Sequence, residues 1–345
     1  MAPHRAHIGE AVPPRLRPTV AVSRRRSGEV FRDSRMTEVL RVDEPGLFTT
    51  IQDLGRPHAI SSGVPPGGAM DRFAHSAANL LLGNDRGAAA LECTLVGPHL
   101  VAERPCTVAI TGADLDPRVN GAQAPMWGAI SLRAGDEVTF GPRRGGARAY
   151  LAVAGGVVGD RWLGSMSTNV MAARGGMHGR PLTRGDLISA GEPVAPPVAR
   201  DGFTPDALPR YADHTLRVIA GPHERHLSPG SREALFKSAF TLSPNSNRMG
   251  YRLEGPRLEV SGEEVLSFGL VAGALQVPAG GMPILLMADH QTAGGYPVVA
   301  TVASAWMPVA AQLAPGDEVR FAETSIEAAL EMRAAQRDAL ESLTS

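Results

Sequence analysis

Glycine and proline interrupt this chain at short intervals, and this constrains its fold more than any other feature of the sequence. There are 39 glycines and 28 prolines among 345 residues. Both residues weaken or end helices and are common in turns. Apolar residues make up 43% of the chain, enough to bury a sizeable core, whereas aromatic residues make up 5%. The composition therefore favours many turns and short strands over long helices.

Composition also excludes several classes of function. The formal net charge is −1, which gives no long-range attraction to nucleic acid. No run of about 18 apolar residues occurs, so we expect no membrane-spanning segment. Cys93 and Cys106 are too few for a disulfide framework or a four-cysteine zinc site. We expect them to be reduced core residues of a cytoplasmic protein.

The single lysine, Lys237, limits the chemistry further. A phosphate-binding loop of the form G-x-x-x-x-G-K-[ST] is excluded, because no lysine stands in that context. A Schiff-base enzyme would have to use Lys237. The neighbouring residues 235–239 lack the Met-Lys-Met pattern of a lysine that carries biotin.

The sequence pattern divides the chain into five segments. The first is Arg-rich without an apolar period, and we expect a disordered or artefactual extension that ends before Met36. Two strand-rich halves follow, joined by a Pro-rich linker, and an Ala- and Glu-rich helix ends the chain. The predicted boundaries are 1–35 for the extension, 36–192 for the first half, 193–212 for the linker, 213–325 for the second half and 326–345 for the C-terminal helix.

The two halves share three landmarks in the same order. Residues 97–100, 112–113 and 135–140 resemble 255–258, 273–274 and 316–321. Chance similarity in a Gly-rich chain is one explanation. The other is that the halves are two related β-barrel units, of which the second carries an inserted functional loop.

Apolar periodicity predicts the individual elements. Helices are expected at 70–82, 231–239 and 325–341. Strands are expected, among other places, at 40–42, 107–111, 137–140, 149–153, 215–220, 265–268, 275–277, 284–287 and 298–302.

The densest polar cluster directly follows the apolar run 283–287. Polar side chains at the end of a strand lie at a rim, and glycines there allow close backbone approach or turn N–H groups toward an anion. A hairpin turn with polar surface residues explains the pattern equally well. The cluster comprises Asp289, Gln291, Thr292, Gly294, Gly295 and Tyr296.

A second cluster contains Asn247, Arg248 and Arg252. The planar guanidinium groups offer paired donors that suit a carboxylate or a phosphate. The alternative is that both arginines pair with Glu254 or Glu259 at the surface.

A third cluster consists of Gln52, Gly67, Gly68 and Asp71. Two glycines before a helix N-terminus can hold an anion, although the signal is weak. Asp71 stands in the expected first turn of the helix, where capping is the alternative role.

Two further positions give weaker signals. Asp114 ends an expected strand and is either a rim carboxylate or a turn residue. His223 and His226 stand three residues apart without an evident third ligand, so we expect no metal site there.

Seven blocks of sequence resemble the allophanate hydrolase subunit 2 family, also described as biotin-dependent carboxyltransferases. This family includes a component of 5-oxoprolinase, the KipA proteins and part of the carboxyltransferase domain of urea carboxylase. The resemblance runs from about Leu40 to Phe321. The blocks are 50–56, 63–71, 78–84, 111–114, 150–156, 247–253 and 291–297.

The resemblance implies a fold and a set of partners. The implied fold is mostly β, with cyclophilin-like β-barrel units in two related halves and few short helices. The implied role is the C subunit of an ATP-dependent 5-oxoprolinase, which hydrolyses 5-oxo-L-proline to L-glutamate. A B subunit of similar fold is the implied partner, and an A subunit completes the complex. ATP, as its magnesium complex, is the implied co-substrate.

The resemblance also suggests roles for the three clusters. A lactam is a stabilised amide, and phosphorylating its carbonyl oxygen with ATP creates a leaving group that water then displaces. We expect Asp289 and Gln291 to position the lactam or the water, and Arg248 with Arg252 to orient anionic oxygens. Backbone N–H groups of the four cluster glycines would assist. The other substrate- or anion-binding candidates are Gln52, Asp71, Asp114, Asn247, Thr292 and Tyr296.

Two departures weaken the expected affinity for anions. His290 stands where the family usually has arginine, and so does Met166. Two other functions therefore stay open. One is carboxyl transfer from biotin carried by another chain, and the other is a KipA-like, non-catalytic protein that binds an inhibitor of a kinase.

Overall fold

The computed structural model describes residues 36–193, 208–261 and 265–343, which belong to one compact unit. The predicted extension at 1–35 and most of the predicted linker lie outside the described residues. No helix within the three described ranges is long and apolar enough to cross a membrane.

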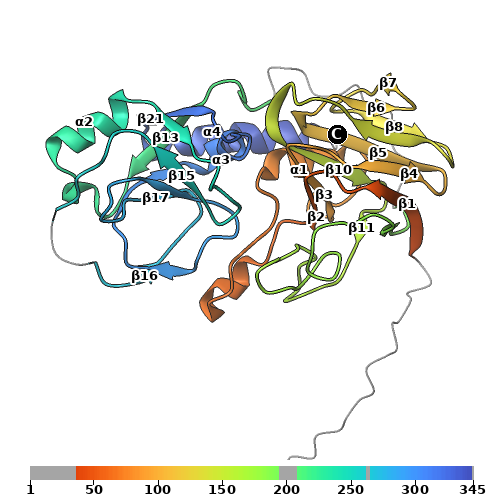
Figure 1. Cartoon of the computed structure of the whole chain (residues 1–345), viewed down its shortest axis with the longest axis horizontal. Helices are drawn as coiled ribbons and strands as arrows, with labels where there is room; N and C mark the ends of the chain where they lie inside the picture. The colour runs from red at the N-terminus through yellow and green to blue at the C-terminus, as the bar shows by residue number, and fades with distance from the viewer. Residues whose placement is uncertain (1–35, 194–207, 262–264, 344–345) are drawn as a thin grey trace, which may run out of the picture. The chain divides into compact units, whose positions relative to one another are not determined.

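The first half consists of two antiparallel sheets with one apolar core between them (Figure 1). Leu40, Leu100 and Ile188 enter this core from one sheet, and Ile110 and Leu151 enter it from the other. Inward-facing residues of both sheets therefore meet in one layer, as in a β-sandwich. The seven-stranded sheet has the order β11 (Val157–Val158), β12 (Leu187–Ala190), β1 (Thr37–Glu44), β4 (His99–Ala102), β9 (Glu137–Phe140), β6 (Pro117–Val119) and β7 (Ala122–Gln123). The five-stranded sheet has the order β2 (Phe48–Gln52), β3 (Ala90–Thr94), β10 (Gly145–Val153), β5 (Cys106–Asp114) and β8 (Ala129–Leu132).

Helix α1 (Arg72–Leu80) covers the other face of the five-stranded sheet. Strand β10 is consequently buried on both faces. Leu151 and Val153 lie in the core between the sheets, whereas Tyr150 and Ala152 pack with α1. A strand buried on both faces needs no alternation of polar and apolar residues, which explains the continuous apolar run in β10.

The second half is a closed β-barrel with its own apolar core. Strands β13 and β21 run parallel, and the other neighbouring strands run antiparallel. Helix α2 (Pro229–Lys237) packs against β21, and a separate ribbon is formed by β16 (Phe268–Gly269) and β19 (Ala293–Gly294). The barrel order is β13 (Thr215–Ala220), β20 (Val298–Val302), β17 (Ala274–Gln276), β18 (Ile284–Leu286), β15 (Gly250–Glu254), β14 (Phe240–Leu242) and β21 (Glu318–Glu323).

Apolar side chains from each end of the junction pack in the core on the other side. Met70 precedes α1 yet packs in the barrel core, while Leu340 and Leu343 at the chain's end pack with Phe73 and other α1 residues. These contacts make the junction a continuous part of the molecular interior. The remaining helices are α3 (Met307–Ala311), α4 (Ile326–Glu341), and the 3-10 turns η1 (Pro57–Ser62), η3 (Glu224–His226) and η4 (Ser304–Trp306).

The prediction of a mostly β fold with few short helices is confirmed. The three expected helices correspond to α1, α2 and α4. The strand expected at 265–268 is wrong, because pairing with β19 begins at Phe268. The second half closes into a barrel, whereas the first forms two sheets, with α1 packed on the outer face of the five-stranded sheet. The predicted domain boundaries stay a prediction.

One of the three shared landmarks has the same local structure in both halves. The side chain of Asp136 accepts a hydrogen bond from Arg133 N (2.6 Å), and that of Asp317 accepts one from Ala314 N (2.8 Å). Each aspartate follows a left-handed glycine and leads into a strand, β9 or β21. The resemblance of 135–140 to 316–321 therefore reflects a repeated turn.

Candidate functional site at the junction of the halves

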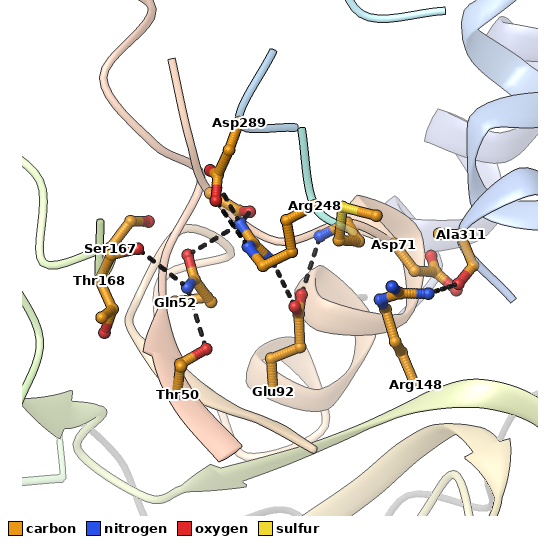
Figure 2. A network of polar contacts seen from close by, with 12 residues as sticks. Thr50, Gln52, Asp71, Glu92, Arg148, Ser167, Thr168, Arg248, Asp289 and Ala311 are labelled. Atoms are coloured by element: carbon orange, nitrogen blue, oxygen red, sulfur yellow. Dashed lines mark hydrogen bonds and ion pairs between the residues drawn. The ribbon is translucent and has the colours of Figure 1, made fainter. Parts of the chain in front are cut away.

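Two residues of the predicted clusters, Arg248 and Asp289, face each other (Figure 2). Arg248 precedes β15 and Asp289 follows β18. Because Gly250 pairs with Leu286 across these antiparallel strands, both residues lie at the same end of the barrel. Arg248 donates from Nε to Oδ2 over 2.9 Å and from Nη2 to Oδ1 over 3.2 Å. Such two-point pairing fixes both groups, and the Asp289 side chain stays 17% exposed.

Arg248 also reaches the first half through Glu92 of β3. The Glu92 side chain is fully buried, and its Oε1 accepts a hydrogen bond from Arg248 Nη1. Its Oε2 accepts from Met70 N (2.9 Å) and from Tyr150 Oη (2.7 Å). Burial favours the neutral carboxyl, but Arg248, Arg148 and these donors outweigh burial and hold the pKa of Glu92 below its ordinary value. Glu92 is thus an ionised, paired carboxylate in the interior.

Asp71 caps helix α1. Its Oδ1 accepts from Ala74 N over 2.9 Å, which confirms the capping interpretation. Its Oδ2 accepts from Gln312 Nε2 of the barrel half over 2.8 Å. Burial raises the pKa of Asp71 to about 6, although these donors oppose the shift. The carboxyl therefore lies inside the junction, with no exposure to solvent.

Gln312 and Arg148 connect the halves a second time. Gln312 Oε1 accepts from Arg148 N over 2.9 Å, and Gln312 Nε2 donates to Arg148 O over 3.0 Å. The Arg148 side chain in turn donates from Nη1 to Tyr251 Oη and Ala311 O, both at 2.6 Å. We call Gln52, Asp71, Glu92, Arg148, Tyr150, Arg248, Asp289 and Gln312 the junction network.

The third predicted cluster, which contains Gln52, Gly67 and Gly68, contacts this network. The glycines do so through other atoms than the expected free N–H groups. Gln52 Oε1 and Gly68 O accept from Arg248 Nη2, at 3.4 and 2.6 Å. Gly67 N donates to Ala288 O over 3.1 Å. Gly68 therefore contributes its carbonyl to this site, and the N–H of Gly67 is used within the protein.

Three predicted site residues lie apart from the junction network. Arg252 and Asn247 are exposed, and Arg252 forms no ion pair with any residue in the described ranges. Alternate residues of β15 point to opposite faces, so Tyr251 is buried and Arg252 is not. Asp114 lines a cavity of about 510 Å³ elsewhere in the first half, together with Pro117, Gln123, Ala124, Pro125 and Met126.

The rest of the Asp289 cluster lies beside the β16–β19 ribbon. Gln291 is exposed and donates to Gln276 Oε1 over 3.4 Å. Thr292 O accepts from Leu270 N, and Tyr296 is 49% exposed. The structure therefore separates Gln291, Thr292, Gly294, Gly295 and Tyr296 from Asp289, which faces the junction.

The two departures from the family pattern have clear structural consequences. His290 is buried, its Nδ1 contacts Gln291 O at 2.7 Å, and burial lowers its pKa. Met166 is half-buried against the core and donates its backbone N–H to Asp53 over 2.7 Å. Neither position supplies a cation to the junction.

The sequence analysis missed Glu92, Arg148, Tyr150 and Gln312 as members of the site. A signal existed for the two charged residues, because each interrupts an apolar run that forms a buried strand. A charge inside such a run needs a buried partner. Tyr150 and Gln312 gave no comparable signal.

The junction network presents a ligand with an oriented hydrogen-bond acceptor, Asp289, and the cation beside it, Arg248, is already paired. Every nitrogen of Arg248 already has a protein acceptor. Asp289 is held by Arg248 and is partly open to solvent, so it can accept a hydrogen bond from a ligand. Among residues 36–193, 208–261 and 265–343, no group of three or more His, Cys, Asp and Glu side chains is placed to hold a metal ion.

Comparison with known proteins identifies the family of this chain. Residues 62–323 match the model of the carboxyltransferase domain, subdomain A and B. The chain is 37% identical over 307 residues to the C subunit of 5-oxoprolinase from Escherichia coli, covering 88% of this chain and 97% of that protein. It is 34% identical over 286 residues to the corresponding 5-oxoprolinase component of Haemophilus influenzae, covering 82% and 91%.

A solved structure, urea amidolyase of Kluyveromyces lactis, superposes with a TM-score of 0.83 at 29% identity. The superposition covers 89% of this chain and 20% of that larger protein. The family match spans both halves and the junction between them. The chain therefore belongs to the family of carboxyltransferase domains with subdomains A and B.

Proposed function

We propose that this chain is the C subunit of a multi-subunit, ATP-dependent 5-oxoprolinase that opens 5-oxo-L-proline to L-glutamate. The observation that carries the proposal is the 37% identity to the Escherichia coli protein, which extends over nearly the whole length of both chains. Similarity at that level and coverage is difficult to reconcile with an unrelated task.

The junction network suits the binding of a small cyclic amide. A lactam presents one N–H donor and one carbonyl acceptor. Asp289 is an oriented carboxylate with an exposed edge, and we assign it the N–H. Arg248 acts by holding Asp289 in place, because each of its three nitrogens already has a protein acceptor. Gln291 lies on the ribbon side of Asp289, where we propose that it contacts the substrate's solvent-facing end.

The residues of the junction do not fit a triphosphate. Phosphate binding needs several free N–H donors or unpaired cations. Arg248 is paired with two carboxylates, and Arg56 has one nitrogen, Nη1, without an acceptor among the described residues. We therefore place ATP and its magnesium ion on the partner subunits, a B subunit and an A subunit. No step on this chain is assigned to ATP.

The test is reconstitution. The chain is mixed with the B and A subunits, 5-oxoproline and ATP, and the formation of glutamate and ADP is measured. We expect both products in equal amounts, dependent on all subunits. A complete mixture in which the subunits assemble but release no glutamate would contradict the proposal and favour a KipA-like, non-catalytic role.

A second candidate is carboxyl transfer from biotin, favoured by the superposition on urea amidolyase. Lys237 lies on α2, exposed, and pairs with Glu233 over 2.7 Å. It therefore lies outside the junction, and a biotin carrier would have to be another chain. Avidin-detectable biotin on a co-purifying protein, with no turnover of 5-oxoproline, is the result that would favour this function.

A further inference from the structure

A second arginine, Arg56, lies beside Asp289 and has no exposure to solvent. Its Nε donates to Trp162 O over 3.3 Å, and its Nη2 donates to Ser165 Oγ over 3.4 Å and to Ser167 O. Its Nη1 has no hydrogen-bond partner among the described residues. Leaving a buried guanidinium N–H unpaired is costly, so this nitrogen requires an explanation.

The close approach of Arg56 to Gly67 shows where Nη1 points. A Cβ atom added to Gly67 would lie 2.9 Å from Arg56 Nη1 and 3.6 Å from Asp289 Oδ1. Both atoms thus lie close to the backbone of Gly67, and a side chain at residue 67 would collide with Arg56 Nη1. Arg56 and Asp289 form no ion pair within 4.0 Å in the described structure. The two side chains are therefore close, but the carboxylate does not pair with Arg56 Nη1.

We infer that Arg56 and Asp289 form a two-point subsite for a carbonyl group whose neighbouring N–H lies in the cis arrangement. The carbonyl oxygen accepts from Arg56 Nη1, and the adjacent N–H donates to Asp289 Oδ1. Lactams and cyclic ureas have this arrangement locked by their rings. The inference rests on the proposed function where it names a lactam as the ligand. The two hydrogen bonds themselves would bind a lactam or a cyclic urea.

The carboxylate has the capacity for this contact. Asp289 Oδ1 accepts one hydrogen bond, from Arg248, and a carboxylate oxygen accepts two. Arg248 also fixes the plane of the carboxylate, so that the remaining lone pair has a defined direction. Entry takes place at Asp289, since its side chain is the partly exposed member of the pair.

The segment that covers Arg56 contains no regular strand, and it is held by hydrogen bonds from Ser165, Met166 and Ser167 to Asp53. The Trp162 ring lies 4.9 Å from the guanidinium carbon. Residues 159–180 around it are connected by isolated β-bridges, such as Asp160 to Gly176 and Asn169 to Arg174, with no named strand. A ligand therefore reaches Nη1 by displacing this segment, which breaks its hydrogen bonds to Asp53.

A matched pair of glycine substitutions tests the subsite. Gly67 and Gly63 have similar left-handed backbones, with φ of +64° and +74°. Gly67→Ala places a methyl group against Arg56 Nη1 and Asp289, whereas Gly63→Ala meets nothing within 4 Å. Both variants carry the same backbone strain. A difference between them therefore reports the methyl group's contact with Arg56 Nη1 and Asp289.

Binding is measured by saturation-transfer NMR on the full chain, alone and with its B subunit. The probes are 2-pyrrolidinone, imidazolidin-2-one and N-methyl-2-pyrrolidinone, which lacks the N–H. We expect the first two to bind the wild-type and Gly63→Ala proteins, and to bind Gly67→Ala about ten- to a hundredfold more weakly. The N-methyl compound is expected to bind weakly throughout. Arg56→Lys serves as a second variant if Gly67→Ala does not fold, and is expected to bind equally weakly.

Equal binding of 2-pyrrolidinone by Gly67→Ala and Gly63→Ala would overturn the inference. So would equal binding of the N-methyl compound by wild type, or the absence of any lactam signal, which would mean that water alone satisfies Arg56. Turnover of 5-oxoproline by the wild-type complex is measured separately. If the wild-type complex turns over 5-oxoproline but Gly67→Ala and Gly63→Ala bind the probes equally, the subsite is wrong and the proposed function stands. If the probes bind as expected but the complex does not turn over 5-oxoproline, the subsite stands and the proposed function is wrong.

Discussion

Individual charges decide what the junction between the halves can do. Arg56, Arg148 and Arg248 lie near three acids, Asp53, Glu92 and Asp289. Asp53 accepts from Gly55 N, Met166 N and two serine hydroxyls, and these donors hold its pKa below the ordinary value although burial opposes them. A buried charge is tolerated when it is paired and hydrogen-bonded. The network therefore stabilises the junction and also fixes the position of Asp289 in the site.

Arg248 and Arg252, four residues apart, should differ sharply in their contribution to stability. Arg248→Met leaves Glu92 and Asp289 without their shared cation, and we expect a loss of about 3–5 kcal/mol in the free energy of unfolding. Arg252→Met changes an exposed side chain without an ion pair and should cost less than about 0.5 kcal/mol. Urea denaturation of both variants checks this, and similar losses would contradict the described roles.

Asp71 should make stability depend on pH in a defined direction. Its pKa is about 6 in the folded chain against 3.8 for the free group, so the folded state binds the proton more tightly. This group therefore adds stability as pH falls from about 7 to about 4, by about 1–3 kcal/mol. We expect the unfolding free energy of wild type minus that of Asp71→Asn to rise by this amount between those pH values. A difference that does not vary with pH would show that Asp71 titrates normally.

Single elements position the network, and the bulge between β5 and β10 is the clearest case. Gly112 of β5 has φ of +82°, and a Cβ atom there would lie 2.4 Å from Arg148 O and 3.3 Å from Gln312 Nε2. The register of β5 and β10 shifts nearby. A glycine at this position lets the backbone of Arg148 approach closely, which sets the contact with Gln312.

Gly112→Ala should therefore be far more costly than a comparable substitution elsewhere. Gly135 has a similar backbone, with φ of +88°, but a Cβ atom there meets nothing within 4 Å. We expect Gly135→Ala to cost about 1 kcal/mol and Gly112→Ala more than about 3 kcal/mol. Thermal or urea denaturation measures both, and equal costs would mean that β5 adjusts freely to a side chain.

The sequence predicted most elements and part of the site, and the exceptions have physical reasons. Helix 70–82 was predictable because its apolar face repeats every three to four residues, and the glycine turns bounded the strands. Arg248 and Asp289, which the sequence analysis assigned to one substrate site, contact each other, while their roles in binding stay a prediction. Glu92 and Arg148 were missed because their strands are buried on both faces, where alternation no longer separates inside from outside. Arg252 was misplaced because its neighbour Tyr251 takes the inward position of β15.

At the scale of the whole molecule, the junction couples the two halves. Met70 packs in the barrel core, Leu340 and Leu343 pack against α1, and the network links Glu92 to Arg248 and Asp71 to Gln312. Removing either half would expose these groups, so neither should remain folded without the other.

The halves should accordingly unfold together. Trp162 belongs to the first half and Trp306 to the second. In variants that keep one of these tryptophans and carry Phe at the other tryptophan positions, we expect fluorescence and far-UV circular dichroism to give coincident urea midpoints. Separate midpoints in the Trp162 and Trp306 variants, with circular dichroism showing two steps, would mean that the halves are independent.

The most direct test of the account is the turnover of 5-oxoproline by the reconstituted complex carrying Asp289→Asn. The substitution keeps the shape of the side chain but removes the carboxylate that we propose accepts the lactam N–H. Asp338→Asn on the exposed face of α4 is the control. We expect glutamate formation to fall by more than about a hundredfold in Asp289→Asn, with the subunits still assembled, and to remain at the wild-type rate in Asp338→Asn. An assembled Asp289→Asn complex that forms glutamate at the wild-type rate would show that the junction is not where the substrate is bound.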